Sequence, residues 1–392
     1  MGSVSPRTAD VVIVGAGVMG ASIAFQLARR GAGRIIVLDK GEVAGGGSGR
    51  SSALVRMHYS FAPEVQLARL SLEMFLAWPE LLGFPSHFRK TGFIRLVPEH
   101  EIDRLRKNVE MQRALGVNAQ VLSRHELHEV APLWDFSDVS AAAFEPDSGY
   151  GDGAGVATDF LARARERGVE YRPGTRVEAL RVEGGRVRGV AVPDGGIEAP
   201  VVVVATGPWC RPLLAAAGFD APIESEFHEV VFLKNPTGME SIGPTGIDSP
   251  TETYYRAEAG GLTLIGDFYG KRGVGPDVFP QTASQEGMLR LVERTARRIP
   301  ALAEAGLFRG VTGCYDMSPD ARPLLGPVPG IVGLHLVAGF SGMGFKISPA
   351  VGVVMAESVC DGRATSVDIT AFRPARFQEG QPIRATHEYA SD

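Results

Sequence analysis

The sequence predicts an α/β protein of two domains, one of which is a Rossmann-like domain that binds a dinucleotide. An apolar run, a glycine-rich turn, a helix and a second apolar run follow one another within residues 10–39. Apolar runs that end on glycine turns recur at residues 201–207 and 334–344. These three elements cannot lie in one contiguous domain unless the segments between them loop out. We therefore expect a cofactor domain assembled from three pieces, with a second domain of mixed or antiparallel sheet inserted between them.

The first element has the order of a dinucleotide-binding motif. Residues 10–14 predict a buried strand, residues 21–30 a helix, and residues 35–38 a second strand that is closed by Asp39. An acid at this place is positioned to bind ribose hydroxyls. The free N–H groups and partial positive charge of the helix N-terminus suit the phosphates. The whole pattern indicates dinucleotide binding rather than a bare turn.

The glycines of the turn GAGVMG have separate roles in this motif. Gly15 allows a tight turn, Gly17 lets the backbone approach a pyrophosphate, and Gly20 lets helix and strand pack closely. The cofactor contacts predicted from the motif are Gly15, Gly17, Val18, Met19, Gly20, Asp39 and Lys40.

A segment rich in glycine and serine, residues 45–52, follows the second strand closely. It could be a flexible linker, but its position beside the nucleotide motif favours a loop that wraps the cofactor. Arg50 could contact a diphosphate, and a solvent-facing side chain is the alternative. The cofactor contacts predicted from this segment are Gly47, Ser48, Arg50, Ser51 and Ser52.

Bulk composition argues against several classes of protein. The chain has 392 residues, enough for two domains, and its net charge of −5 argues against general affinity for nucleic acid or anionic membranes. No apolar run reaches the roughly 18 residues of a membrane span, and the first ten residues lack a signal core. Cys210, Cys314 and Cys360 are far apart, and the histidines show no ligand spacing. We expect a cytoplasmic protein with no metal.

The rest of the chain alternates predicted helices with short strands. Apolar residues at helical spacing predict the helices, and Ser123 with Glu126 predicts a capping box over 123–130. Glycine-rich turns separate the short strands between residues 169 and 205. Helices are expected at 64–78, 101–115, 160–167 and 284–298, and strands at 92–97, 169–171, 176–182, 187–192, 201–205, 223–233 and within 253–268.

The last third repeats the order of strand, glycine turn and helix. Residues 334–338 predict a strand, residues 339–344 a loop, and residues 349–359 a helix whose N-terminus points back at that loop. The expected cofactor domain comprises 8–52, 150–215 and 315–378, the expected substrate domain 53–149 and 216–314, and the tail 379–392.

Five motifs, in this order, resemble the D-amino acid oxidase superfamily of flavoproteins, in the branch of sarcosine and dimethylglycine oxidases and dehydrogenases. They are DVVIVGAGVMGASIAFQLARRG with Asp39, VVVVATG, YDMSPDARPLLG, GLHLVAGFSGMGFKISPAVG and the tail AFRPARF. The resemblance spans nearly the whole chain and implies FAD, since a simple NAD enzyme does not need the late glycine loop. Backbone N–H groups of that loop would stabilise the reduced flavin. The further contacts it implies are Val177, Ala205, Thr206, Gly207, Trp209, Gly342, Met343, Gly344, Phe345 and Lys346.

The resemblance also implies residues at the substrate. Lys346 and Arg56 would hold a substrate carboxylate, which the planar guanidinium fork binds in a bidentate manner. A surface lysine and a structural salt bridge are the alternatives. His58 is a weaker catalytic candidate, because a single histidine is more often structural. Tyr254 and Tyr255 could line the substrate side, but one of two neighbours on a strand faces away, and Tyr255 is slightly favoured.

The flavin-linking residues of some family members are missing here. Their cysteine aligns with Gly313, and Cys314, one residue away, is expected to point away from the flavin. Others use a histidine where residues 150–158 have none. Non-covalent FAD is therefore favoured.

A second departure concerns the electron acceptor. Oxidases of the family place a lysine near the flavin to promote the reaction with oxygen. Thr263 or Ile265 lies near that position, although Lys271 follows within a few residues. Oxygen and a partner electron carrier both remain possible acceptors.

Together these features predict FAD-dependent oxidation of a small amino acid or a secondary or N-methyl amino acid. Hydride would pass from the carbon next to nitrogen to flavin N5, and the resulting imine would hydrolyse. One alternative is a dehydrogenase subunit that passes electrons to a partner within a larger complex. Another is a non-catalytic assembly factor with a flavoprotein fold. The oligomeric state is left open.

Overall fold

The computed structural model describes residues 7–389, and its centre is a six-stranded sheet drawn from three distant parts of the chain. The sheet is parallel except at the β21 edge. The strands β2, β3 and β14 consist only of Val, Ile and Leu, because both faces of the sheet are buried there. Its order is β10 (Glu170–Arg172), β3 (Ile35–Leu38), β2 (Val11–Val14), β14 (Val201–Val204), β22 (Leu334–Ala338) and β21 (Leu324–Pro327).

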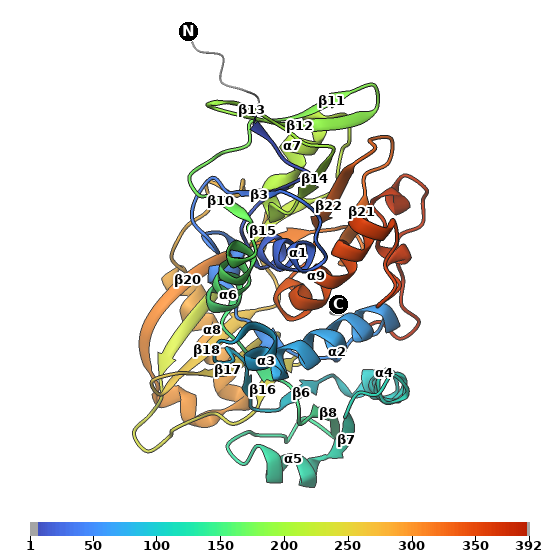
Figure 1. The fold of residues 1–392 in the computed structure, drawn as a ribbon. Coiled ribbons are helices and arrows are strands. Elements are labelled where there is room, and N and C mark those ends of the chain that lie inside the picture. Colours follow the sequence, from blue (N-terminus) through green and yellow to red (C-terminus); the bar gives the residue numbers. More distant parts are fainter. Residues whose placement is uncertain (1–6, 390–392) are drawn as a thin grey trace.

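Different layers cover the two faces of this sheet (Figure 1). On one face, α1 (Val18–Arg29) packs against α6 (Gly153–Glu166) and α9 (Gly344–Asp361). On the other lie α7 (Cys210–Ala216) and a small sheet, whose apolar side chains join those of the central strands in one core. The small sheet consists of β1 (Arg7–Thr8), β13 (Gly195–Glu198), β12 (Arg186–Val192) and β11 (Ala179–Glu183).

A nine-stranded, mostly antiparallel sheet forms the second half of the molecule, in the lower part of Figure 1. Its longest pair joins β15 (Glu224–Lys234) to β20 (Gly306–Met317) along almost their whole length. The remaining strands are β19 (Lys271–Arg272), β18 (Leu262–Asp267), β17 (Thr253–Glu258), β16 (Thr245–Asp248), β6 (Phe93–Leu96), β8 (Ala141–Glu145) and β7 (Gln120–Ser123).

Helices and short elements complete this half. The predicted capping box is confirmed: the Ser123 hydroxyl accepts from the Glu126 N–H, and the Glu126 carboxylate accepts from the Ser123 N–H, at the start of α5. The helices are α2 (Ala62–Leu76), α3 (Trp78–Leu82), α4 (Ile102–Ala114), α5 (Arg124–Val130) and α8 (Gln285–Arg298), and a three-stranded sheet contains β4 (Leu54–Val55), β9 (Gly149–Tyr150) and β5 (Arg89–Lys90).

The predicted α/β architecture is confirmed by these layers, whereas the division into domains stays a proposal. The six-stranded sheet draws its strands from the three segments expected to bind the cofactor. The nine-stranded sheet draws on the segments expected to bind the substrate, although β20 runs across the expected boundary after residue 314.

Two predicted helix starts are wrong. Helix α9 begins at Gly344 rather than at residue 349, so Pro349 lies inside it. The carbonyl that loses its partner at this proline is that of Phe345, and the Ser348 hydroxyl donates to it at 2.8 Å. Helix α6 begins at Gly153 rather than at residue 160, with Asp152 as its N-cap.

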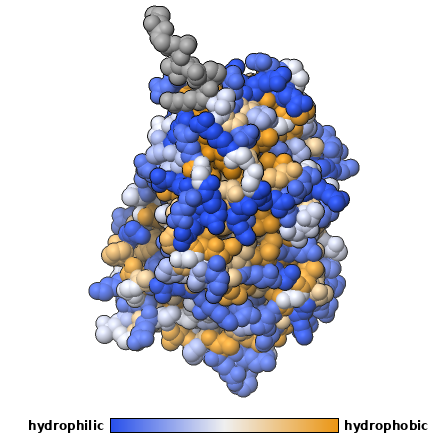
Figure 2. Space-filling view, in the orientation of Figure 1, coloured by the Kyte–Doolittle hydropathy of each residue, from blue (hydrophilic) through white to orange (hydrophobic). Residues whose placement is uncertain are grey.

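The described surface gives no sign of a membrane span. On the face shown in Figure 2, hydrophilic side chains predominate and apolar ones lie between them. Within residues 7–389, no helix is both long and apolar enough to cross a bilayer.

Candidate cofactor and substrate site

A cavity of about 690 Å³ lies where the carboxyl ends of β2, β3 and β14 meet the glycine turns. In open α/β sheets this is the edge at which ligands bind. Eighteen of the predicted cofactor contacts line it: Gly15, Gly17, Val18, Met19, Asp39, Lys40, Gly47, Ser48, Arg50, Ser51, Val177, Ala205, Thr206, Gly207, Trp209, Gly342, Gly344 and Phe345. Gly20, Ser52, Met343 and Lys346 are not among its lining residues.

The first glycine turn is held by close backbone contacts. Gly15 has φ +108°, and a Cβ there would lie 2.4 Å from the Ala205 carbonyl oxygen. A Cβ on Gly20 would lie 1.9 Å from the Gly15 carbonyl oxygen, so Gly20 serves packing rather than ligand contact. Gly17 has ordinary extended φ, and its missing side chain would point toward the Ser48 hydroxyl at 3.0 Å. Gly17 therefore keeps space open at the N-terminus of α1.

The side chains of Asp39 and Ser48, which lie outside this turn, hydrogen-bond to its backbone. The Asp39 carboxylate accepts hydrogen bonds from the N–H groups of Ala16 at 2.7 Å and Gly41 at 2.8 Å. The Ser48 hydroxyl, in the 3₁₀ turn η1 (Gly47–Arg50), accepts from the Val18 N–H at 3.0 Å. The glycine–serine segment thus packs around the N-terminus of α1, and the alternative of a flexible linker is disfavoured. Contact of Asp39 with a ribose stays a prediction.

A cluster of Lys40, Trp209 and Asp277 closes one part of the cavity. Asp277 Oδ1 lies 2.6 Å from Lys40 Nζ and accepts from the Trp209 indole N–H at 2.9 Å. Lys40 Nζ also lies 4.1 Å from the centre of the Trp209 ring. No pattern in the sequence pointed to Asp277, because it lies in an irregular segment after β19 and far from Lys40 and Trp209 along the chain.

The second glycine turn, residues 339–344, meets strand β20. A Cβ on Gly342, which has φ +84°, would lie 2.8 Å from Cε2 of Tyr315. Asp316 Oδ2 accepts from the Gly339 N–H at 2.6 Å. Burial raises the pKa of Asp316 to about 6, against the opposing effect of the backbone N–H groups that it accepts. Tyr315 and Asp316 line the cavity, and sequence reasoning missed them although they belong to the motif YDMSPD.

Lys346 is buried beside this turn. It lies in the first turn of α9 with 6% of its surface exposed, so the alternative of a surface lysine is wrong. Its Nζ donates to the Gly342 carbonyl at 3.3 Å. Burial holds the pKa of Lys346 well below its usual value; the positive charge of Arg56 lowers it further, and Glu64 opposes the shift. A buried amine and a guanidinium therefore lie within electrostatic range of each other.

Arg56 follows β4 and lies between aromatic rings. Its guanidinium donates to the His58 carbonyl and lies 4.3 Å from the centre of the Tyr59 ring. No carboxylate of the described residues forms an ion pair with Arg56, which disfavours the structural salt bridge. Its Nε is buried and unpartnered among the same residues. Arg56 does not line the large cavity, and it approaches the second glycine turn through Lys346.

His58 has a structural environment. Its Nε2 lies 2.7 Å from the Tyr389 hydroxyl, and the ring is buried. Burial lowers the pKa of His58 well below its usual value, and the charges of Arg95 and Arg56 add to this effect. His58 does not line the cavity. The structural alternative for His58 is thus favoured over the catalytic one.

The two neighbouring tyrosines face opposite sides of the sheet, and Tyr254, not the slightly favoured Tyr255, faces the glycine turns. Tyr255 packs edge-on against Trp134 at 5.0 Å, and its hydroxyl donates to Asp248 at 3.3 Å, on the face away from the glycine turns. Tyr254 lies on the other face. Burial raises the pKa of its hydroxyl, and the neighbouring side chains of Tyr315 and Ser52 oppose this shift. The pleat alternates side chains, and the register of β17 decided which one faces inward.

Cys314 and Gly313 lie next to each other on β20. Cys314 packs with Phe227 and Phe279, and burial raises the pKa of its thiol to about 11. Cys314 also lines the cavity, so its expected orientation away from the flavin is not confirmed. A Cβ on Gly313 would lie 3.5 Å from the Arg50 carbonyl oxygen.

On β18, neither predicted position brings a cation to the glycine turns. Thr263 donates to Asn235 at 2.6 Å, and Ile265 joins the core around Tyr255. Lys271 is exposed. Among residues 7–389, no group of His, Cys, Asp and Glu has the arrangement of a metal site.

Comparisons with known proteins agree with this geometry. The chain is 28% identical over 390 residues to the beta subunit of sarcosine oxidase from an Arthrobacter species, covering 96% of this chain and 93% of that protein. It is 26% identical over 376 residues to glycine oxidase from Geobacillus kaustophilus, covering 94% and 97%. The crystal structure of L-proline dehydrogenase from P. horikoshii superposes with a TM-score of 0.90 at 29% identity, covering 96% of this chain and 100% of that one.

The family itself is shown by a match along most of the chain. The sequence profile of the DAO family, described as FAD-dependent oxidoreductases, matches residues 10–358. The cavity fits that cofactor, because eighteen of the residues predicted to contact it line the cavity and Gly17 leaves open the space that a Cβ would occupy at the N-terminus of α1. The chain belongs to the DAO family of FAD-dependent oxidoreductases.

Proposed function

We propose that this protein oxidises a small amino acid whose nitrogen is secondary or N-methylated. The single observation that carries the proposal is the buried amine of Lys346 beside the glycine turn, within electrostatic range of the half-buried Arg56 guanidinium. A buried amine and a half-buried guanidinium that lie close together are stabilised by an anion, and a substrate carboxylate supplies one. The related proteins whose names include sarcosine and proline act on secondary amines with a carboxylate, which supports this class.

The chain's own residues would bind and orient the substrate. Bound FAD supplies a hydride acceptor at flavin N5, and the imine product hydrolyses in water. Arg56 would fix the carboxylate in the plane of its guanidinium, and Lys346 would hold the same group from the side of α9. Tyr254 supplies an aromatic surface on the sheet. No general base is required if the amine binds in its neutral form, so orientation contributes most of the rate.

The residues also favour non-covalent attachment of FAD. Gly313 offers no side chain for a link, and the Cys314 thiol packs among aromatic rings. We expect all flavin fluorescence to leave the polypeptide in a denaturing gel. Fluorescence that stays with the protein band would contradict non-covalent attachment.

The test of the proposed reaction is anaerobic bleaching of the bound flavin. Sarcosine, proline and glycine would be added in parallel with the matched amines dimethylamine and pyrrolidine, which lack the carboxylate. We expect bleaching by sarcosine or proline and by neither simple amine, and bleaching by glycine alone would contradict the secondary or N-methylated nitrogen. Bleaching by the amines alone would contradict the carboxylate site.

A dehydrogenase subunit that passes electrons to a partner is the second candidate. Thr263 and Ile265 face away from the glycine turns, so β18 brings no lysine to promote reaction with oxygen. The name of the related beta subunit adds support for partner subunits. Turnover with an artificial acceptor but not with oxygen would favour this candidate, and equal turnover with both would favour an oxidase.

A further inference from the structure

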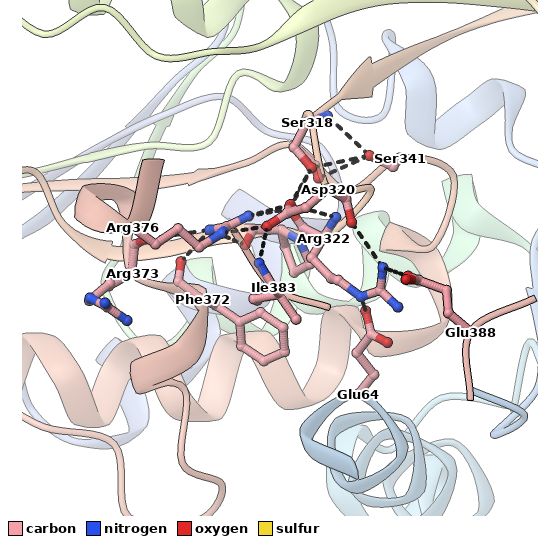
Figure 3. A network of polar contacts seen from close by, with 12 residues as sticks. Glu64, Ser318, Asp320, Arg322, Ser341, Phe372, Arg373, Arg376, Ile383 and Glu388 are labelled. Carbon is pink, nitrogen blue, oxygen red and sulfur yellow. Dashed lines mark hydrogen bonds and ion pairs between the residues drawn. The ribbon is translucent and has the colours of Figure 1, made fainter. Parts of the chain in front are cut away.

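The C-terminal segment, residues 373–389, crosses from one half of the molecule to the other. Arg376 is fully buried and binds Asp320 through two hydrogen bonds, of 2.9 and 2.8 Å. The Ile383 N–H donates to the same carboxylate at 2.9 Å. Glu388 pairs with Arg322, which also pairs with Glu64 at 3.3 Å (Figure 3). The segment is therefore tied firmly beside the loop after β20.

Its last described residue reaches the segment that carries Arg56. The His387 carbonyl accepts from the Asn108 side chain at 2.9 Å, and the Tyr389 hydroxyl lies 2.7 Å from His58 Nε2. Tyr389 is 3% exposed, and its ring lies 4.8 Å from the Arg95 guanidinium. The His58 carbonyl accepts from the Arg56 guanidinium. One chain of contacts thus runs from Tyr389 through His58 to Arg56.

We propose that residues 373–389 form a clasp that holds Arg56 in its binding orientation, with Tyr389 as the positioning residue that acts through His58. The inference rests on the proposed carboxylate-binding role of Arg56. Arg56 makes no ion pair with the described residues, so few contacts fix its orientation, and the His58 carbonyl is one of them. A His58 ring that is held on its Nε2 side keeps that carbonyl in place. The tail, which contributes nothing to the large cavity, would thereby set affinity for the substrate.

The test uses the FAD-loaded full chain and the variant Tyr389→Phe, which keeps the ring and removes the hydroxyl. Acetate is the probe, its binding read from the visible spectrum of the flavin, with acetamide as the uncharged control. We expect the acetate Kd to rise about three- to tenfold, as for the loss of one buried hydrogen bond, with FAD content unchanged. Tyr269→Phe, at an exposed tyrosine, is the matched control and should leave the Kd unchanged.

A double-variant cycle separates positioning from general loosening. In the background of Arg56→Met, Tyr389→Phe should change the acetate Kd by less than about twofold, because the group it positions is gone. An equal rise in both backgrounds would overturn the clasp. Asn108→Ser, which weakens the hold on His387, should raise the Kd in the same direction by a smaller factor.

Hydrogen exchange distinguishes failure of the clasp from failure of the proposed function. In Tyr389→Phe, the amides of residues 56–59 should exchange faster, while those of residues 15–20 should not change. If Arg56→Met leaves acetate binding unchanged, the carboxylate role of Arg56 fails. Faster exchange at 56–59 would then still support the mechanical clasp, and unchanged exchange would overturn it.

Discussion

The two glycine turns at the cavity are built alike but lie in different surroundings. In each, a carboxylate from a neighbouring strand accepts a backbone N–H of the turn: Asp39 from Ala16 at 2.7 Å, and Asp316 from Gly339 at 2.6 Å. Each turn leads directly into a helix, α1 or α9. A Cβ on Gly15 of the first turn would meet Ala205 in the same half of the molecule, whereas one on Gly342 of the second turn would meet Tyr315 of β20, a strand of the large sheet.

Burial is what makes the two turns chemically different. The carboxylate at the second turn is buried, which raises the pKa of Asp316 to about 6. The same turn carries a buried amine, Lys346, whose pKa burial lowers. Because desolvation opposes charge on both groups, the second turn can respond to a bound anion or to pH. We infer that the first turn holds the cofactor and the second couples it to the substrate.

The largest effect is expected at the first turn, from Gly17→Val. The backbone at Gly17 tolerates a side chain, but that side chain would fill the space toward Ser48 at the N-terminus of α1. We expect a folded protein with FAD content below about a tenth of wild type. Gly306→Val, at a site with ordinary room on β20, is the control and should be yellow. Normal FAD content in Gly17→Val would break the assignment of the first turn.

The next effect is expected at the second turn, from Lys346→Met. Removing one of two cations leaves a bound carboxylate partly unpaired, a loss of about 2–5 kcal/mol by analogy with buried charge pairs. We expect kcat/KM to fall about 30-fold or more in steady-state assays, with FAD content near normal. Loss of FAD at full specific activity per flavin would reverse the roles given to the two turns.

The variant Asp316→Asn should differ from wild type in how its thermal stability depends on pH, because it removes the buried carboxyl group at the second turn. The pKa of Asp316 is raised from 3.8 to about 6 on folding, so its contribution to stability is fully present below pH 3.8 and is lost as pH rises through 6. The difference in Tm, variant minus wild type, should therefore increase from pH 5 to pH 7.5, by the equivalent of about 1.4 kcal/mol, because the rest of the full effect of about 3 kcal/mol arises below pH 5. A pH-independent difference would show that Asp316 is ionised throughout.

The smallest effect is expected from Ser48→Ala at the first turn. The variant loses the hydroxyl that accepts from the Val18 N–H, a change of about 1 kcal/mol for a helix N-terminus. FAD affinity, measured by fluorescence during reconstitution, should weaken by about fivefold. Thr at this position should restore most of the affinity, because it keeps the hydroxyl. A loss as complete as that in Gly17→Val would mean that Ser48 binds the ligand itself.

Local patterns in the sequence predicted the first turn well and the second turn less well. The order of strand, glycines, helix and Asp39 is a local motif, so all of its predicted contacts except Gly20 line the cavity. For the second turn, Pro349 suggested that the helix starts there, and only the structure shows the Ser348 hydroxyl replacing the missing N–H. Lys346 consequently lies on the helix rather than in the loop.

The sequence by itself determined the α/β class, the two helix–turn elements and nearly half of the residues that line the cavity, because these depend on the order of nearby residues. Tertiary structure decided which of Tyr254 and Tyr255 faces inward, that Asp277 closes on Lys40 and Trp209, and that His58 is bound by Tyr389. These facts depend on strand register and on contacts between residues as many as 331 positions apart, which no local pattern encodes.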